Sequence, residues 1–382
     1  MTVEVDGAAG PKFDEVRALL AEHLDSGAEL GASLAVDVDG ETVVDLWGGH
    51  ADAARTRPWT GDTIVNVWSS TKTVTNLAAL VLADRGLLDL SAPVARYWPE
   101  FAANGKDAIE VRHVMSHTSG VSGWETPWAI EDMYDWERST AQLARQAPWW
   151  EPGTASGYHA CNQGQLVGEI VRRITGASLK EFVRTELAGP LGADFQIGAR
   201  PEDDHRVAEI VPPPPLDLDL SAVPPDHPMV KTFTGPVGDA AAANTTDWRR
   251  ADMGAHNGHG NARSLARMLS PISRGGVANG VRLLSPAVID LIFEEQAKGV
   301  DLVLGVPLRW GLGYALPEPE TVPSIPADAG RICFWGGWGG SMIVMHPDRG
   351  LTISYVMNRM SPGVIGSERS NAYIAAIYEA LD

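Results

Sequence analysis

The sequence contains few cysteines, no long apolar run and no obvious leader. Its 382 residues include two cysteines, Cys161 and Cys333, which excludes a disulfide framework and a four-thiolate zinc site. No apolar run approaches the roughly 18 residues that span a bilayer. The first ten residues lack the basic and apolar segments of a secretory signal. We therefore expect a cytoplasmic protein with reduced, buried thiols and no membrane contact.

Positive charge is scarce as well. The 30 Lys and Arg residues stand against 49 Asp and Glu residues, so the formal net charge is −19. A face that binds nucleic acid needs clustered Lys and Arg, so we expect no nucleic-acid partner. Hydrophobic residues make up 44% of the chain, which is enough for a sizeable core and excludes general disorder.

Common hydrolase and nucleotide-binding signatures are also absent. There is no G-x-S-x-G, so an α/β-hydrolase nucleophile elbow is not supported. There is no H-E-x-x-H and no glycine-rich phosphate loop. The pairs His113/His117 and His256/His259 have a spacing that could hold a metal, but no matched carboxylate or thiolate accompanies them. We expect solvent-exposed or loop histidines there, and no metal or cofactor.

Strand-like segments lie towards both ends of the chain. Ala32–Val38 and Glu41–Trp47 are joined by Asp39-Gly40, a strong signal for a two-residue hairpin. The last hundred residues return to strands, whereas the middle is mostly helical. We predict one α/β unit over residues 1–382. Its sheet lobe would comprise residues 1–62 and 275–382, and its mainly helical lobe would comprise residues 63–274.

The middle segment also holds a Pro-rich stretch, residues 211–228, which cannot form a regular element. We predict a long ordered loop there, because folded-looking sequence continues on both sides. The sequence leaves open whether this loop covers a ligand site. A cleft between the two lobes is a natural place for such a site.

One motif can carry chemistry: Ser69-Ser70-Thr71-Lys72, at the start of a helix predicted over residues 70–86. Residues three apart share a helix face, so the Ser69 hydroxyl and the Lys72 amine can meet. A lysine in a low-dielectric cleft has a depressed pKa and can help to deprotonate the serine. On its own, the pattern also fits an N-cap serine followed by an exposed lysine.

Two further segments supply what such a serine needs. Tyr158 lies in a Gly-flanked turn, where its phenol could act as a proton shuttle, with the phenolate favoured near the Lys72 ammonium. The stretch Phe334–Ser341 is rich in glycine, which often marks the close approach of a backbone or ligand. It could offer a backbone N–H to a developing oxyanion. The alternatives are a packing tyrosine and a plain Gly-rich turn.

Taken in order, these segments resemble the serine β-lactamase and penicillin-binding superfamily. The class C-type branch is matched by further stretches, namely Gly86–Leu90, Tyr97–Phe101, His113–Gly120 and Asn261–Arg267. The resemblance covers residues 15–380. It implies a β-lactamase-like fold, in which an antiparallel sheet built from both termini is flanked by helices and a mainly helical subdomain is inserted.

Within that branch the chain looks most like the family VIII carboxylesterases. β-Lactamases carry K-T-G on the third-motif strand, whereas this chain has Trp335-Gly336-Gly337. The change removes a cation that would hold the carboxylate of a β-lactam. The triplet Tyr158-His159-Ala160 stands where β-lactamases of this branch have Y-x-N, and it is similar to bacterial esterases for pyrethroid-type esters. Both departures indicate an ester substrate.

The resemblance also implies roles for particular residues. Ser69 would be the acylated nucleophile, Lys72 its proton acceptor, and Tyr158 the proton shuttle. The backbone N–H groups of Ser69 and Trp338 would form the oxyanion hole. The partner would be a small-molecule ester, cleaved through an acyl-enzyme without a cofactor.

The sequence has thirteen tryptophans, several of them in the predicted helical lobe. We predict that Trp124, Trp128 and Trp150, with His159, line an apolar substrate pocket. For any single tryptophan, packing in the core is the alternative.

Other functions stay open at this point. An acyltransferase would share the chemistry up to the acyl-enzyme and differ only in the acceptor. Weak β-lactam or amide hydrolysis, or a ligand-binding module without turnover, would use the same fold. The sequence does not name the physiological ester or its stereochemistry, and it leaves a homo-oligomer open.

Overall fold

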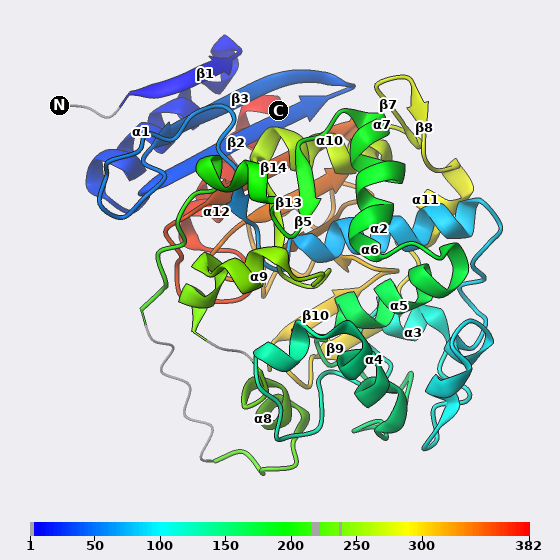
Figure 1. Ribbon diagram of the computed structural model, residues 1–382. Helices are drawn as coiled ribbons and strands as arrows, with labels where there is room; N and C mark the ends of the chain where they lie inside the picture. Colours follow the sequence, from blue (N-terminus) through cyan, green and yellow to red (C-terminus); the bar gives the residue numbers. More distant parts are fainter. Residues whose placement is uncertain (1–3, 215–221, 237–238) are drawn as a thin grey trace.

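The computed structural model describes residues 4–214, 222–236 and 239–382 (Figure 1). Part of the predicted Pro-rich loop 211–228 therefore lies outside the described residues. A nine-stranded antiparallel sheet forms the centre of the described part. In pairing order its strands are β1 (Val5–Ala9), β3 (Glu41–Gly49), β2 (Gly31–Val38), β14 (Leu351–Met357), β13 (Met342–His346), β12 (Cys333–Gly336), β11 (Ala315–Leu316), β10 (Pro307–Trp310) and β9 (Ala297–Val300).

The β2–β3 hairpin follows from its turn residues. Asp39 and Gly40 have φ angles of 52° and 88°, and two left-handed residues make the turn whose twist matches the flanking strands. Strand β14 then pairs with β2 over its whole length, from Leu351 opposite Val38 to Met357 opposite Ala32. The sheet thus joins the two ends of the chain, and the predicted architecture is confirmed.

Three long helices pack beside this sheet. Helix α10 (Ala262–Ser273) lies against β2, β13 and β14, while α1 (Asp14–Ser26) and α12 (Glu368–Leu381) pack against each other (Figure 1). Although α10 falls within the predicted helical lobe 63–274, it packs on the sheet. The boundary between the lobes stays a prediction.

Helix α2 (Thr71–Asp84) is the central helix of the molecule. It contacts α5 (Gln163–Thr175), α10 and strand β12, and every residue from Thr71 to Leu82 is buried. A helix with no exposed face over this length is enclosed by the fold. This enclosure removes the polar groups of its first turn, Lys72 among them, from solvent.

The remaining elements are short. The other helices are α3 (Val111–Met115), α4 (Trp136–Arg145), α6 (Leu179–Phe182), α7 (Gly189–Leu191), α8 (Pro228–Phe233), α9 (Thr246–Arg250) and α11 (Pro286–Ile292). Two small sheets are formed by β4 (Val65–Asn66), β6 (Gly258–Gly260) and β5 (Phe195–Ile197), and by β7 (Val277–Ala278) and β8 (Val281–Arg282).

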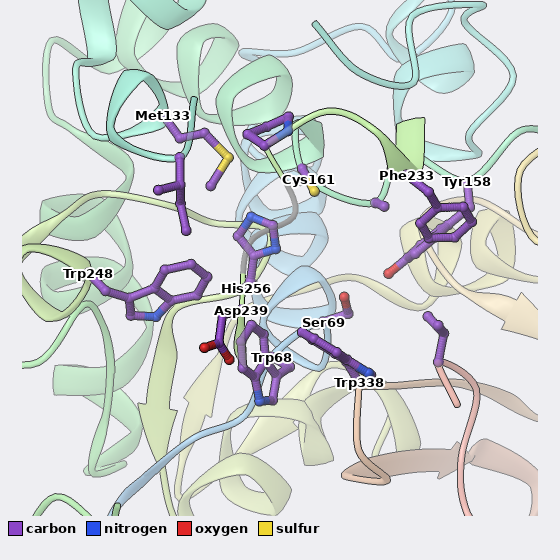
Figure 2. A pocket seen from close by; sticks show the side chains of 14 residues that line it. Trp68, Ser69, Met133, Tyr158, Cys161, Phe233, Asp239, Trp248, His256 and Trp338 are labelled. Carbon is purple, nitrogen blue, oxygen red and sulfur yellow. The ribbon is translucent and has the colours of Figure 1, made fainter. Parts of the chain in front are cut away.

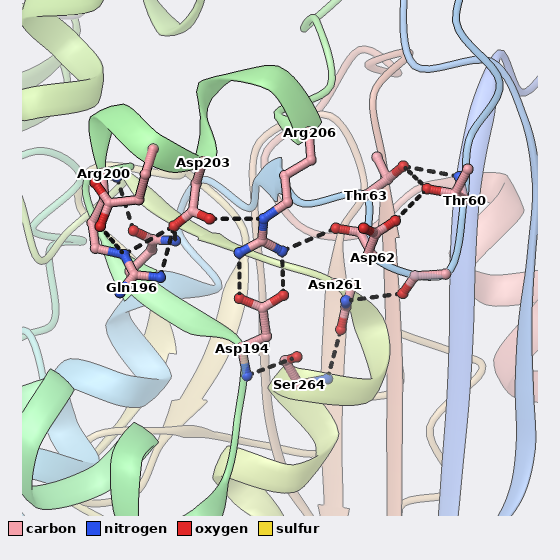
Figure 3. Close-up of polar contacts among 12 residues, drawn as sticks. Thr60, Asp62, Thr63, Asp194, Gln196, Arg200, Asp203, Arg206, Asn261 and Ser264 are labelled. Atoms are coloured by element: carbon pink, nitrogen blue, oxygen red, sulfur yellow. Dashed lines mark hydrogen bonds and ion pairs between the residues drawn. The ribbon is translucent and has the colours of Figure 1, made fainter.

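An ion-pair network supports the chain that leads into α2 (Figure 3). The Arg206 guanidinium pairs with Asp194 and Asp203 and also donates to the backbone oxygen of Asp62, 3.0 Å away. Burial alone would raise the pKa of Asp203, but hydrogen bonds from Arg206, Gln196 and Arg200 outweigh it and lower this pKa to about 2. The network ties β5 and the segment after it to the turn before β4.

Candidate active site

Ser69 lies on a turn in front of α2 rather than in the helix. The preceding residue, Trp68, has a left-handed φ of 49°, which is uncommon for a bulky residue. The backbone N–H groups of Thr71 and Lys72 donate to the carbonyls of Trp68 and Ser69, each at 2.9 Å. The helix therefore begins at Thr71, slightly later than predicted. Ser69 is 6% exposed.

Lys72 is buried directly beside Ser69. Its Nζ lies 3.0 Å from Ser69 Oγ and donates to the carbonyls of Ala160 and Ala255 at 2.7 and 2.9 Å. No carboxylate of the described residues pairs with it, and burial lowers its pKa to about 7. A neutral amine has two N–H groups, which the two carbonyls accept. Its lone pair then faces the Ser69 hydroxyl.

Tyr158 is held from several directions. Its backbone N–H donates to Asp301 Oδ1 at 2.9 Å, and its ring stacks on Trp310 with centroids 6.2 Å apart. The Trp335 indole N–H donates to the phenol oxygen at 3.1 Å, and the phenol also hydrogen-bonds with Ser69. The structure thus brings Ser69, Lys72 and Tyr158 together, although they come from distant parts of the sequence.

The predicted ionisation of Tyr158 is wrong. Burial raises the pKa of this phenol well above its ordinary value, and the hydrogen bonds with Ser69 and Trp335 offset only part of that rise. The Lys72 Nζ lies over the ring face, 4.9 Å from its centroid. Burial therefore dominates over the neighbouring amine, and Tyr158 is a neutral phenol. The group poised to accept a proton is Lys72.

The third motif ends strand β12 and leads into a turn that is fastened to the chain before α2. A Cβ on Gly337 would lie 2.3 Å from the carbonyl oxygen of Val67, so only glycine allows this close approach. Ser341 Oγ donates to the same Val67 oxygen at 2.8 Å and lies 3.0 Å from Ser70 Oγ. These contacts fix the turn that carries Trp338 relative to Ser69.

Two residues of the cavity that Ser69 lines, Ser69 itself and Trp338, have an unpaired backbone N–H group. Within the described ranges, no acceptor takes a hydrogen bond from the backbone N–H of Ser69 or of Trp338. A free backbone N–H at a cavity can donate to a ligand oxygen. These two N–H groups are the pair predicted to form the oxyanion hole, and that role stays a prediction.

Ser69 opens into a largely apolar cavity (Figure 2). Its volume is about 750 Å³ when the part open to solvent is included. Besides Ser69 and Tyr158, its lining residues are Trp68, Ile130, Met133, Ala160, Cys161, Phe233, Pro236, Asp239, Trp248, His256, Trp338 and Val364. No lysine or arginine is among them, so the wall offers no cation to an anionic substrate.

The predicted pocket residues do not line this cavity. Trp124 is buried and stacks on Trp128 with centroids 5.7 Å apart. The Trp150 ring meets His159 edge-on, and His159 is buried with its Nε2 2.6 Å from Ser119 Oγ. These side chains pack among themselves, so the prediction for all four residues is wrong.

Most of the residues that line the cavity were not identified from the sequence. Trp68 and Trp338 could have been proposed, because one directly precedes Ser69 and the other directly follows the third motif. Trp248, Phe233 and His256 come from segments without a motif. His256 had been considered only for its spacing to a second histidine.

The described residues form no metal-ligating cluster, no membrane-spanning helix and no disulfide. No group of three or more His, Cys, Asp or Glu side chains in the described ranges could hold a metal ion. No described helix is long and apolar enough to cross a bilayer. Both cysteines, Cys161 and Cys333, are free and buried.

Comparisons with known proteins agree with the β-lactamase-like fold. Residues 16–376 match the family model described as Beta-lactamase. The chain is 35% identical to the esterase/β-lactamase LipL of Mycobacterium tuberculosis, over 99% of this chain and 88% of that protein. It superposes on a crystal structure of a family VIII carboxylesterase with a TM-score of 0.91 and 38% identity, covering 99% and 100% of the two chains. A penicillin-binding protein homologue from Caulobacter crescentus gives 0.89 and 36%, with 99% and 100% covered.

Proposed function

The chain belongs to the β-lactamase family, and on that premise we propose that it is a serine carboxylesterase that forms an acyl-enzyme on Ser69. The observation that carries the proposal is the contact of Ser69 Oγ with Lys72 Nζ at 3.0 Å, on the wall of an apolar cavity. A hydroxyl beside an amine that can lose its proton near neutral pH is the arrangement of an activated nucleophile.

The third motif favours an ester over a β-lactam. Trp335 stands where β-lactamases have a lysine, and its indole N–H is engaged with the Tyr158 phenol. The cavity wall therefore lacks a cation for a β-lactam carboxylate. The structural relative described as a family VIII carboxylesterase supports the same preference, whereas LipL is named as both an esterase and a β-lactamase.

In the proposed acylation step, neutral Lys72 takes the Ser69 proton and Oγ attacks the ester carbonyl. The backbone N–H groups of Ser69 and Trp338 stabilise the oxyanion. When the tetrahedral intermediate collapses, the proton returns through the Tyr158 phenol to the leaving alkoxide. In deacylation the same groups take a proton from the water that attacks the acyl carbonyl, and they return it to Ser69 Oγ as the carboxylic acid leaves.

Acyl transfer is a second candidate, because the apolar cavity wall also suits an alcohol acceptor. The chemistry up to the acyl-enzyme would be the same, and only the nucleophile of the second step would differ. A cytoplasmic location is part of the proposal too, since both thiols are free.

The test combines turnover with mass spectrometry of the intact protein. Ser69→Ala should lower hydrolysis of p-nitrophenyl butyrate by at least about 10³-fold and abolish the acyl adduct. Ser70→Ala is the matched control, because its hydroxyl is adjacent but fully buried, so an adduct should still form on Ser69. Added alcohols should reveal transfer if it competes with hydrolysis. Retained turnover in Ser69→Ala, or faster turnover of nitrocefin than of esters, would contradict the proposal.

A further inference from the structure

Several polar side chains in the cavity wall have no role in the proposed reaction, among them Asp239, the indole N–H groups of Trp68 and Trp338, and His256. His256 lines the cavity and is 6% exposed, and its Nε2 is buried without a hydrogen-bond partner in the described part of the chain. His117 and His159, buried nearby, both use ring nitrogens in hydrogen bonds. An unpaired buried polar atom is costly, so His256 suggests a partner that arrives with the substrate.

The position of His256 is tied to the catalytic lysine. The carbonyl of the preceding residue, Ala255, accepts the hydrogen bond from Lys72 Nζ, and the backbone N–H of His256 donates to Met253 at 3.0 Å. Its ring packs beside Trp248, with centroids 5.5 Å apart. Burial, and to a smaller degree the Lys72 charge, lower its pKa well below the ordinary value. The imidazole is therefore neutral, with one donor and one acceptor nitrogen.

The cavity has two sides with respect to Ser69. In Figure 2, His256 and Trp248 lie on one side of Ser69, whereas Tyr158 and Phe233 lie on the other. Tyr158 has to reach the oxygen of the leaving alcohol, so the alcohol portion of a bound ester lies on the Tyr158 side. The acyl portion then extends towards His256 and Trp248.

We propose that His256 determines specificity for an acyl group that is otherwise apolar and carries a hydrogen-bonding oxygen, a hydroxyl or a carbonyl. This inference rests on the proposed esterase function. A plain alkyl acyl group would leave Nε2 unpaired among aromatic walls, whereas an oxygen substituent at the right position would satisfy it. Sites that pair a buried polar group with a substrate group discriminate strongly against the analogue that lacks it.

The experiment compares matched acyl groups on the same alcohol. Ethyl hexanoate is compared with ethyl 3-oxohexanoate, ethyl 6-hydroxyhexanoate and both enantiomers of ethyl 3-hydroxyhexanoate, by the rate of ethanol release. For the wild-type protein, kcat/KM should be about tenfold or more higher for at least one oxygen-bearing ester than for ethyl hexanoate. The readout is this ratio, which cancels changes in the amount of active enzyme.

Substitutions then assign the ratio to His256. His256→Leu, which is apolar, should bring the ratio to about one or below. His256→Gln keeps a side chain that can donate and accept, and should retain part of the preference. Met133→Leu is the matched control, because it alters the same wall without removing a polar group, and its ratio should stay at the wild-type value.

The outcomes separate this inference from the esterase proposal. If the wild-type protein hydrolyses ethyl hexanoate as well as every oxygen-bearing ester, the inference is overturned while the esterase function stands. A preference that persists in His256→Leu overturns it as well. A protein that hydrolyses none of the esters, and forms no adduct on Ser69, contradicts the function itself.

Discussion

Lys72 and Lys106 are both buried, and no carboxylate of the described residues pairs with either. Each Nζ lies over an aromatic ring, at 4.9 Å from the Tyr158 centroid and 5.2 Å from the Phe101 centroid. Burial lowers the pKa of Lys72 to about 7 and that of Lys106 to about 8. Burial alone therefore does not distinguish the proposed catalytic lysine from the other one.

The two lysines differ in their hydrogen-bond partners. Lys106 Nζ donates to three backbone carbonyls, those of Ala103, Ala144 and Gln146. Carbonyls can only accept, so these partners require all three ammonium protons. Lys72 has two carbonyl partners and the Ser69 hydroxyl, which can either accept or donate. The reversible partner is what allows Lys72 to exchange a proton.

The largest expected effect comes from replacing Lys72 by methionine, with the same replacement at Lys106 as the comparison. Lys72→Met should lower kcat for p-nitrophenyl butyrate by about 10²- to 10³-fold, because general-base catalysis is lost. Lys106→Met should leave kcat within about threefold of the wild-type value, since it lies away from Ser69. Steady-state kinetics of both variants, with thermal melts as a check on folding, measure this difference. Equal losses of kcat would remove the distinction drawn above.

The pH profile tests the same distinction without a substitution. Catalysis needs the neutral amine of Lys72, and this amine gains a proton as the pH falls below its pKa of about 7. The value of kcat/KM should therefore rise with pH, level off above about pH 7, and be about a hundredfold lower two units below that point. Lys106→Met should show the same profile. An acid limb centred near pH 5 would indicate a different base.

Lys106 should matter for stability instead. Lys106→Met leaves three carbonyls without their donor, and we expect the free energy of unfolding to fall by about 2 kcal/mol. Lys72→Met should cost less, because Ala160 lines the open cavity, where water can replace the amine. Urea unfolding of the two variants decides the order. A larger loss in Lys72→Met would assign it a structural role as well.

The smallest expected effect concerns Tyr158, the other side chain that hydrogen-bonds with Ser69. Trp335→Phe removes the N–H that orients the Tyr158 phenol, so kcat should fall by about tenfold while KM changes less. The acid limb of the pH profile should not move, because Lys72 is unaffected. A shift of that limb, or a change confined to KM, would mean that Trp335 acts on Lys72 or on substrate binding rather than on Tyr158.

Local signals predicted much of the fold. The Asp39-Gly40 turn and the strands on either side of it were recognisable because the turn chemistry lies within two adjacent residues. The apolar stripe of residues Gln163–Thr175 has a regular helical period, and the structure has helix α5 there. The three residues that meet at Ser69 were identified through the order of their motifs and the resemblance that followed, not through periodicity.

What the sequence could not predict depends on long-range packing. Trp124 and Trp128 stack on each other, whereas Trp248 reaches the cavity from a segment far along the chain. Composition does not tell one tryptophan from another. The neutral state of Tyr158 was missed for a similar reason. Burial raises the pKa of the phenol and outweighs the effect expected from Lys72. The extent of that burial is known only from the fold.

The contact of Ser341 with Ser70 and Val67 joins positions more than 270 residues apart. During synthesis, the nucleophile leaves the ribosome early, but the turn bearing Trp338 and the strands that hold it follow only near the end. A nascent or C-terminally truncated chain therefore carries Ser69 without the turn that completes its surroundings. We therefore expect such a chain to form no acyl adduct on Ser69 until β14 closes the sheet.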